Sequence, residues 1–227
     1  MNGEDPRTRI LDAAGPVFAE KGFQAATVRD ICRRARVNAA SVNYYFGDKE
    51  TLYIETVRLA RQLRTRQYPL PERPFGTPPE VRLRDFIITL MHRVLAGNQV
   101  SWNTKLMMRE VLHPTKACRA LVEEYIRPQF EVLSGIVREL VPEDTSPAEV
   151  RKIGFSILGQ CLYYRFANEV SKLLTPEQEL ETHFQMEQIA DHVTRFSLAA
   201  IGCTSPLSDS GPAAEGDAAT LIESPQI

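Results

Sequence analysis

Two short helices joined by a tight corner are predicted between residues 27 and 49, and this stretch constrains the fold more than any other. Thr27 is a suitable helix N-cap. Val28, Ile31 and Ala35 then recur at the spacing of one apolar helix face, which predicts a helix of about eight residues.

A second helix is predicted after a break near Arg36. Asn38 can cap it, its first residues are small, and Val42 and Phe46 lie four residues apart on its inward face. Two helices around a three- or four-residue corner form a helix-turn-helix, in which the second helix enters the major groove of DNA.

The run from Phe18 to Leu52 resembles the N-terminal DNA-binding domain of the TetR regulators. The resemblance rests on an F-x-x-K-G corner, the helix-turn-helix and a Y-x-F-x-x-K-E exit, and it comprises Phe18, Lys21, Gly22, Thr27, Ile31, Ala35, Val37, Val42, Tyr44, Tyr45, Phe46, Lys49, Glu50, Thr51 and Leu52. One position departs from the family, because Arg36 stands where a Gly is common. A left-handed non-Gly residue costs on the order of 1 kcal/mol, and Arg36 is either a phosphate contact or a solvated turn residue.

The resemblance implies a set of DNA-binding residues. Those expected to contact the DNA backbone are Thr27, Ser41, Tyr44, Tyr45 and Lys49, and Arg29 is a further expected DNA-binding residue. Those expected to face bases are Asn38, Ala39, Ala40 and Asn43, because Asn pairs with adenine and Ala meets the thymine methyl group.

Charge is distributed unevenly along the chain. The net charge is −2, but residues 1–66 hold twelve Lys/Arg and eight Asp/Glu, and the remainder holds fifteen and twenty-one. A basic N-terminal part on an acidic body fits a protein that touches DNA with one end only.

Other classes of protein are not favoured. The four cysteines are far apart and the N-terminus is polar, so we expect a reduced, cytoplasmic protein. No apolar run is long enough to cross a membrane. We predict no enzyme, no catalytic residue, no metal and no cofactor, because the motifs of zinc proteases, phosphate-binding loops, serine hydrolases and dinucleotide-binding folds are absent.

The predicted fold is all-α, with about nine helices. A helix-turn-helix head with its linking helix is expected over 1–66, a proline-rich connector over 67–79, a helical effector-binding and dimerisation domain over 80–202, and a disordered tail over 203–227. Pro128 lies inside a long amphipathic stretch, so we expect a kink or break near Arg127.

The body is expected to dimerise and to hold a small hydrophobic effector, as the resemblance implies. The candidate pocket residues are Phe86, Met91, Trp102, Leu106, Met107, Arg109, Glu110, Phe130, Gln160 and Tyr163. The candidate dimer contacts are Phe155, Leu158, Leu162, Phe184, Ile189, Val193 and Phe196. Both sets have a plainer interpretation as protomer core, and Arg109 and Glu110 could form an intramolecular network.

Two segments, MMREVLHPTKA and ILGQCLYYRFA, are similar to the effector domain of the CecR-like branch of the TetR regulators. The predicted function is therefore a homodimeric repressor that binds a double-stranded palindromic operator and is released by a small molecule. The alternative is a helical ligand-binding or scaffold protein with a vestigial helix-turn-helix.

Overall fold

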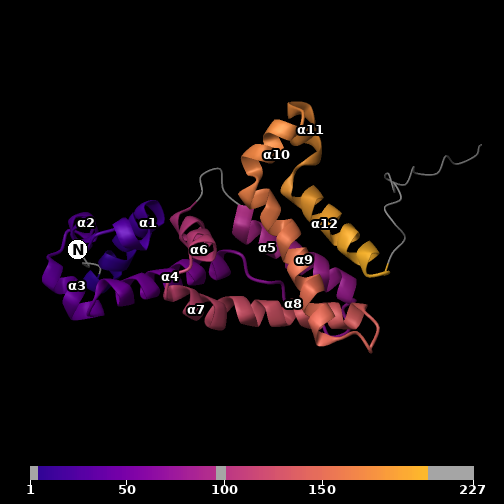
Figure 1. Cartoon of the computed structure of the whole chain (residues 1–227), viewed down its shortest axis with the longest axis horizontal. Coiled ribbons are helices and arrows are strands. Elements are labelled where there is room, and N and C mark those ends of the chain that lie inside the picture. Colours follow the sequence, from indigo (N-terminus) through magenta and orange to yellow (C-terminus); the bar gives the residue numbers. More distant parts are fainter. Residues whose placement is uncertain (1–4, 96–100, 204–227) are drawn as a thin grey trace, which may run out of the picture.

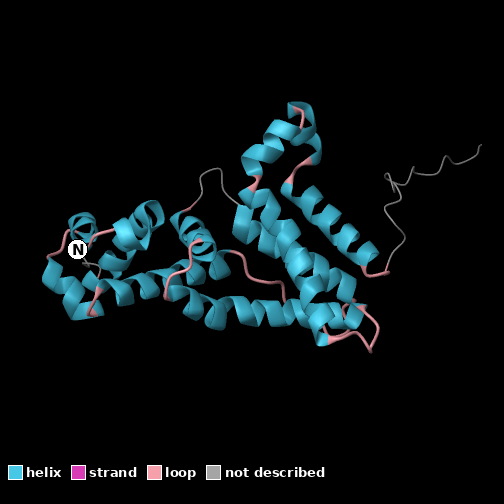
Figure 2. Ribbon diagram, in the orientation of Figure 1, coloured by secondary structure: helices cyan, strands magenta, loops and turns pink. Residues whose placement is uncertain are grey.

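The computed structural model describes residues 5–95 and 101–203, and all the regular structure within them is helical (Figures 1 and 2). The elements are α1 Pro6–Ala25, α2 Val28–Ala35, α3 Ala39–Phe46, α4 Lys49–Gln67, α5 Pro79–Leu95, α6 Trp102–Leu112, α7 Ala117–Leu121, the π-helical turn η1 Val122–Ile126, α8 Arg127–Leu140, α9 Pro147–Phe166, α10 Asn168–Leu174, α11 Glu177–His183 and α12 Met186–Ala200. Counted with α7, η1 and α8 as one continuous run, these are eleven helices. The all-α prediction is confirmed.

The predicted count of about nine helices is too low, because the C-terminal region divides further than expected. We predicted one helix through Leu174, but Ala167 leaves the helical conformation (φ −100°, ψ 17°) and separates α9 from α10. Pro176 and Gln185 then begin two separate helices, α11 and α12. The periodicity of apolar residues does not reveal these breaks, because a single non-helical residue hardly disturbs it.

The N-terminal head is built from α1 to α4 around one apolar cluster that includes Ile10, Phe18, Ile31 and Leu52. Leu106 and Met107 of α6 belong to the same cluster. The indole of Trp102 lies so close to Gly15 of α1 that a Cβ there would come within 2.5 Å of the ring. The head therefore shares its core with α6, which is a helix of the body.

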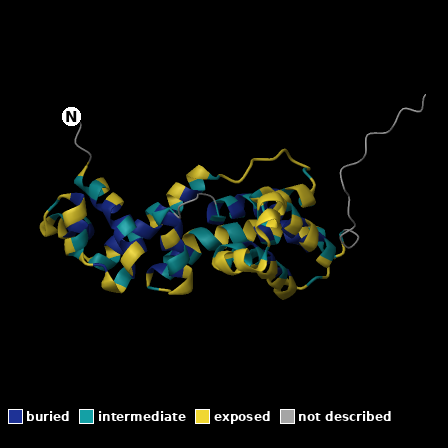
Figure 3. Ribbon diagram, turned by 90° about the horizontal axis from the view of Figure 1, so that it is seen from above, coloured by how far each residue is buried: buried dark blue, intermediate teal, exposed yellow. Residues whose placement is uncertain are grey.

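The body packs α5 against α8, α9 and α12 around a second apolar cluster, which includes Leu83, Ile87, Leu133 and Ile157. Figure 3 shows the buried residues inside both groups of helices and the exposed residues on their outer faces. No described helix is long and apolar enough to cross a membrane.

The segment between α4 and α5 forms no helix, as its prolines require. It is fixed to the body by a bidentate ion pair in which Arg73 donates to Asp85 over 2.6 and 2.8 Å. The connector is therefore attached to the body at a point within it as well as at its ends.

The helix does not break near Arg127, and the chain remains helical through Pro128. A π-helical turn ends at Ile126, directly before α8, and Pro128 occupies the first turn of α8. An ordinary residue at 128 would donate to the carbonyl of Glu124, four residues earlier. That carbonyl instead accepts a 2.9 Å hydrogen bond from Arg61 of α4.

Candidate nucleic-acid interface and ligand cavity

The helix-turn-helix is set by three side-chain caps. Thr27 Oγ1 accepts from the Asp30 N–H at 3.1 Å, Asn38 Oδ1 from the Ser41 N–H at 3.0 Å, and Asp48 Oδ1 from the Thr51 N–H at 2.7 Å. Each cap satisfies a backbone donor that the first helical turn leaves free. The three caps fix where α2, α3 and α4 begin.

The corner between α2 and α3 turns on Arg36, which is left-handed (φ 55°, ψ 47°). Arg9 of α1 stabilises this end of α2, because its guanidinium donates to the carbonyls of Ala35 and Arg36 at 2.8 Å. The sequence does not predict this contact of Arg9, because the two segments lie far apart in the chain.

The outward face of α3 carries the residues that were predicted to meet bases. Ala39, Ala40 and Asn43 are exposed, and Tyr44 is 82% exposed. Val42 and Phe46 are buried in the head core, as their spacing predicted. The amide oxygen of Asn38 is already used as the helix cap.

The other predicted DNA-binding residues lie around this face in different environments. Thr27 and Arg29 are exposed, and Ser41 is half-buried. Tyr45 is half-buried against the head core and meets Tyr44 edge to face. Lys49 donates to the carbonyl of Gln24 at 3.2 Å and lies 4.7 Å from the ring centre of Phe23, so it ties α4 to the end of α1.

Asp30 anchors two cations on the surface of the head. It accepts from Lys21 at 2.8 Å and from Arg33 at 2.9 Å. The hydrogen bond from Lys21, followed by the bond from Thr27, lowers the pKa of Asp30 to about 2. The carboxylate therefore stays charged and holds these cations in place at neutral pH.

A cavity of about 250 Å³ lies in the body between α4, α5, α6, α7, η1, α8 and α9. The surface that its wall exposes is mostly apolar. The wall consists of Arg64, Phe86, Leu90, Arg93, Val94, Thr104, Met107, Met108, Val111, Leu121, Tyr125, Ile126, Gln129, Phe130, Leu158 and Leu162. We call it the apolar cavity. Three predicted pocket residues line it: Phe86, Met107 and Phe130.

The other predicted pocket residues lie off this wall. Met91 and Leu106 are buried in the two cores, and Tyr163 is half exposed. Gln160 reaches Ser197 of α12 at 3.4 Å. Trp102 and Arg109 lie against α1 at Gly15 and Gly22. Helical spacing identifies these residues as inward-facing, but it does not reveal which neighbour each one meets.

Glu110 belongs to an intramolecular network. This is one of its two interpretations from sequence, the other being a place in the ligand pocket. It is fully buried, and its oxygens accept from Tyr53 at 2.6 Å and from the N–H and hydroxyl of Thr115 at 2.6 and 2.8 Å. The bond to Tyr53 joins α6 to α4 across the boundary between head and body.

Two arginines in the wall of the apolar cavity were not predicted. Arg64 is 2% exposed and donates to the carbonyls of His92 and Arg93 at the end of α5, each over 3.0 Å. Arg93 donates to the carbonyl of Tyr68 at 2.8 Å and to the side chain of Gln129. Arg64 is therefore not a solvated surface arginine of α4, because its guanidinium caps the end of α5.

The predicted dimer residues divide into inward and outward sets. Ile189 and Val193 are buried in the body core, which corrects their assignment as contact residues, and Leu158 and Leu162 line the apolar cavity. Phe184 is half-buried. Phe155 and Phe196 are exposed on α9 and α12 by 61% and 48%. Of the seven predicted residues, Phe155 and Phe196 are the exposed ones.

The described residues contain no group of three or more His, Cys, Asp or Glu side chains that could hold a metal ion.

Comparison with known proteins agrees with this geometry. Residues 10–56 match the family described as bacterial regulatory proteins, tetR family, and residues 79–201 match the C-terminal domain of the HTH-type transcriptional dual regulator CecR. CecR of Shigella flexneri is 27% identical over 184 residues, which cover 77% of this chain and 82% of that protein. The repressor KstR2 of Rhodococcus jostii is 42% identical over 52 residues, which cover 23% of this chain and 26% of that protein.

Solved structures share the fold. AibR in complex with isovaleryl coenzyme A and operator DNA has a TM-score of 0.61 at 18% identity and covers 85% of this chain and 97% of its own. A TetR-like transcriptional regulator from Rhodococcus sp. RHA1 has a TM-score of 0.55 at 16% identity and covers 88% and 97%. With a capped helix-turn-helix in front and the CecR-type domain over more than half its length, the chain belongs to the TetR family of bacterial transcriptional regulators, in the CecR branch.

Proposed function

We propose that this regulator is a cytoplasmic homodimeric repressor that binds a palindromic operator and is released when a small molecule enters the apolar cavity. The observation that carries the proposal is the position of α6, which has the cavity on one side and the head on the other. Thr104, Met107, Met108 and Val111 line the cavity. Trp102, Arg109 and Glu110 contact α1 or α4.

This position of α6 provides a route from the cavity to the DNA. A ligand that moves α6 would push the rigid indole of Trp102 against Gly15 of α1, where there is no space for a methyl group, and would also shift the more flexible end of Arg109 that lies against Gly22. Closely packed interiors transmit such shifts instead of absorbing them. The head would then change its orientation relative to the body.

Helix α4 provides a second route. Arg58 holds the carboxylate of Glu124 in η1 over 3.1 Å through Nε, and Arg61 holds the carbonyl of the same residue. Arg64 is bonded to the end of α5 and lines the cavity. These contacts connect α4 to two walls of the cavity. They support the proposal that α4 links the DNA-binding head to the body.

Dimerisation is proposed through the outer faces of α9 and α12. Phe155 and Tyr163 on α9 and Phe196 on α12 are large apolar side chains that are about half exposed. Large exposed apolar side chains that gather on one face mark interaction surfaces. Phe155 also stacks on Phe130 of the cavity wall, with ring centres 4.9 Å apart, so the proposed interface adjoins the cavity.

The mechanism is a population shift. A dimer whose heads lie about one helical turn of DNA apart fits two half-sites. A ligand that favours another spacing of the heads weakens operator binding, and the operator must then weaken ligand binding by the same factor. The relative from Shigella flexneri is named a dual regulator, and repression is the outcome we propose for this chain.

The test is an operator titration with the purified full chain on DNA from the region upstream of its own gene, with and without compounds from a ligand library. The proposal predicts selective binding by a dimer and at least one compound that reduces it, with the reciprocal loss of affinity for that compound. Operator and ligand binding without mutual effect would contradict the mechanism. Binding no better than to scrambled DNA would favour the scaffold alternative.

A further inference from the structure

A second hollow of about 470 Å³ lies beside the apolar cavity, between α6 and the junction of α9 with α10. Its wall consists of Lys105, Met108, Arg109, Leu112, His113, Arg165, Phe166, Asn168 and Glu169. We call it the cationic cleft. Met108 lies in the walls of both hollows, so they adjoin each other.

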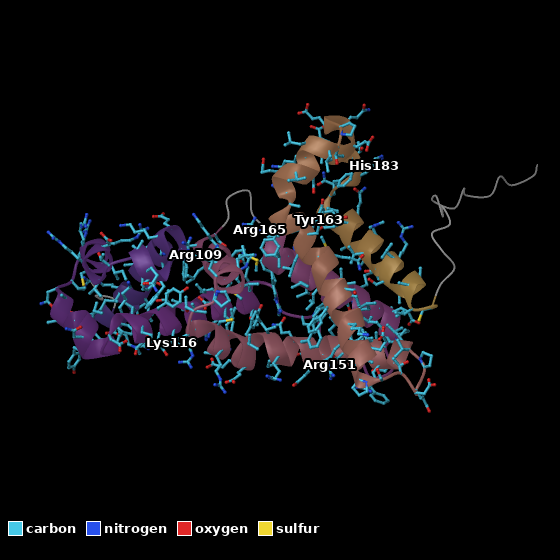
Figure 4. The ribbon with its side chains drawn as sticks, viewed as in Figure 1. Arg109, Lys116, Arg151, Tyr163, Arg165 and His183 are labelled. Atoms are coloured by element: carbon cyan, nitrogen blue, oxygen red, sulfur yellow. The ribbon has the colours of Figure 1, made fainter. Side chains whose placement is uncertain are left out.

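The cleft carries an excess of positive charge. Lys105, Arg109 and Arg165 are cations, and Glu169 is the one acidic residue in the wall. Glu169 is also engaged elsewhere, because its Oε1 accepts from Lys172 at 3.2 Å and from Asn168 at 2.9 Å. Figure 4 shows Arg109 on α6 and Arg165 on α9 at this part of the molecule, with Arg151 at the opposite end of α9.

The three cations of the cleft have hydrogen-bond donors that no described residue uses. Within residues 5–95 and 101–203, the side chains of Lys105, Arg109 and Arg165 make no hydrogen bond and no ion pair. The arginines of the apolar cavity differ, because Arg64 and Arg93 donate to carbonyls and to Gln129. An anion would therefore find free donors in the cleft instead of deep in the cavity.

The positive field of the cleft reaches the cavity. Burial lowers the pKa of Arg64, while Tyr68 and Tyr125 oppose this effect. Repulsion from Arg165 adds a smaller lowering of the same pKa. An anion bound near Arg165 would neutralise this repulsion. The two hollows thus offer one apolar site and one anion site to a single molecule.

The apolar cavity is large enough for a sizeable group. A dry cavity of about 150 Å³ suffices for benzene, and this one has about 250 Å³. It is lined by Met107, Met108, Phe130 and other adaptable apolar side chains, which suits an acyl chain or an aryl group.

We propose that the effector is an amphipathic polyanion whose apolar group fills the cavity between α5, α6 and α8 and whose multiply charged head lies in the cleft against Lys105, Arg109 and Arg165. The inference rests on the proposed function and names the chemical class of its effector. A head with several negative charges, such as a phosphorylated carrier, matches three cations better than a single carboxylate does.

The experiment compares three kinds of probe by calorimetry on the full chain: coenzyme A thioesters with short, medium and long acyl chains, the corresponding free carboxylates, and coenzyme A without an acyl group. We expect at least one thioester to bind about tenfold more tightly than its carboxylate and than coenzyme A itself. Each part alone lacks either the charged or the apolar contact.

Variants of the cleft locate the head group. Arg165→Ala and Lys105→Ala should each weaken thioester binding about tenfold and leave carboxylate binding unchanged, while Arg165→Lys retains most of the affinity. The matched control is Arg151→Ala, which removes an exposed arginine from the same helix far from the cleft. Lys105 is exposed, so its variant serves if Arg165→Ala folds poorly.

Equal affinities for thioesters and carboxylates, or thioester binding that neither cleft variant changes, would overturn the inference. So would a failure of every thioester to bind. The proposed function is judged separately by operator binding of the ligand-free protein and by its release with any compound, so the two ideas can fail independently.

Discussion

The hydroxyl of Tyr53 donates a 2.6 Å hydrogen bond to Oε2 of Glu110, and both side chains are buried. Tyr53 belongs to α4 of the head and Glu110 to α6 of the body, 57 residues apart in the chain. Burial, together with the bond to Glu110, raises the pKa of Tyr53 well above its usual value, so the phenol keeps its proton. One buried polar contact thus joins the two helices that border the ligand cavity and the DNA-binding head.

Tyr53→Phe tests this contact with little change of shape. The substitution leaves an oxygen of Glu110 buried without its donor, so we expect the free energy of unfolding to fall by about 1–3 kcal/mol. Chemical denaturation measures the difference. Tyr45→Phe is the control: Tyr45 is half-buried in the same head, and a change within about 0.5 kcal/mol is expected there. A Tyr53→Phe variant as stable as the control would contradict the account.

Arg36→Gly should relieve the strain of the left-handed corner. The relief is about 1 kcal/mol, and the larger entropy of an unfolded chain with Gly offsets part of it. We therefore expect thermal unfolding at a slightly higher temperature. Arg36→Ala keeps the Cβ atom and removes the charge, so it should give no such gain. Equal stabilities of the two variants would show that the backbone at residue 36 is not strained.

Asn43→Ala and Arg29→Ala should affect DNA binding in different ways. Asn43 lies on the exposed face of α3, so its loss should change the preferred operator bases, at about 1–3 kcal/mol for a bidentate contact. Arg29 is exposed on α2, so its loss should weaken binding to all sequences and reduce the salt slope by about one. Anisotropy titrations with operator variants at several salt concentrations separate the two effects. Arg195→Ala, on α12, should change neither quantity, and an unchanged preference for Asn43→Ala would remove it from base recognition.

The stability that Asp30 contributes should depend on pH, because the pKa of Asp30 is lowered in the folded chain. Its pKa is about 2 in the folded chain against an ordinary value of 3.8, so its contribution to stability is complete above pH 3.8 and is lost as the pH falls towards 2. Asp30→Asn should therefore lower stability at pH 7 and make little difference below pH 2. Unfolding curves of both proteins across this range provide the measurement. A difference that does not shrink in acid would contradict the assignment.

Local features of this chain could be predicted from its sequence, and long-range contacts could not. Thr27, Asn38 and Asp48 act on donors three residues away, so their caps can be read from spacing alone. Arg9 and Arg64 are different, because each bonds carbonyls that are more than twenty residues distant. No local pattern distinguishes such an arginine from a solvated one.

The residues of the ligand cavity and of the dimer surface could likewise not be assigned from sequence patterns alone. The apolar spacing of Ile189 and Val193 correctly marks an inward helix face, but a face against α5 and a face against a second chain have the same pattern. Leu158 and Leu162 likewise face a cavity that only the packing of seven elements creates. The family resemblance predicted that a pocket exists, and the fold was needed to say which residues line it.

The most direct test of the central claim is a selection of duplex DNA from a random pool by the purified full chain, followed by titration of the enriched sequence at two salt concentrations. A dimeric helix-turn-helix regulator should select a palindrome with half-sites about one helical turn apart. Two protein chains should bind each such site, with an affinity at least about a thousandfold above that for scrambled DNA. No enrichment, or equal affinity for enriched and scrambled sequences, would show that the helix-turn-helix of this chain does not read DNA.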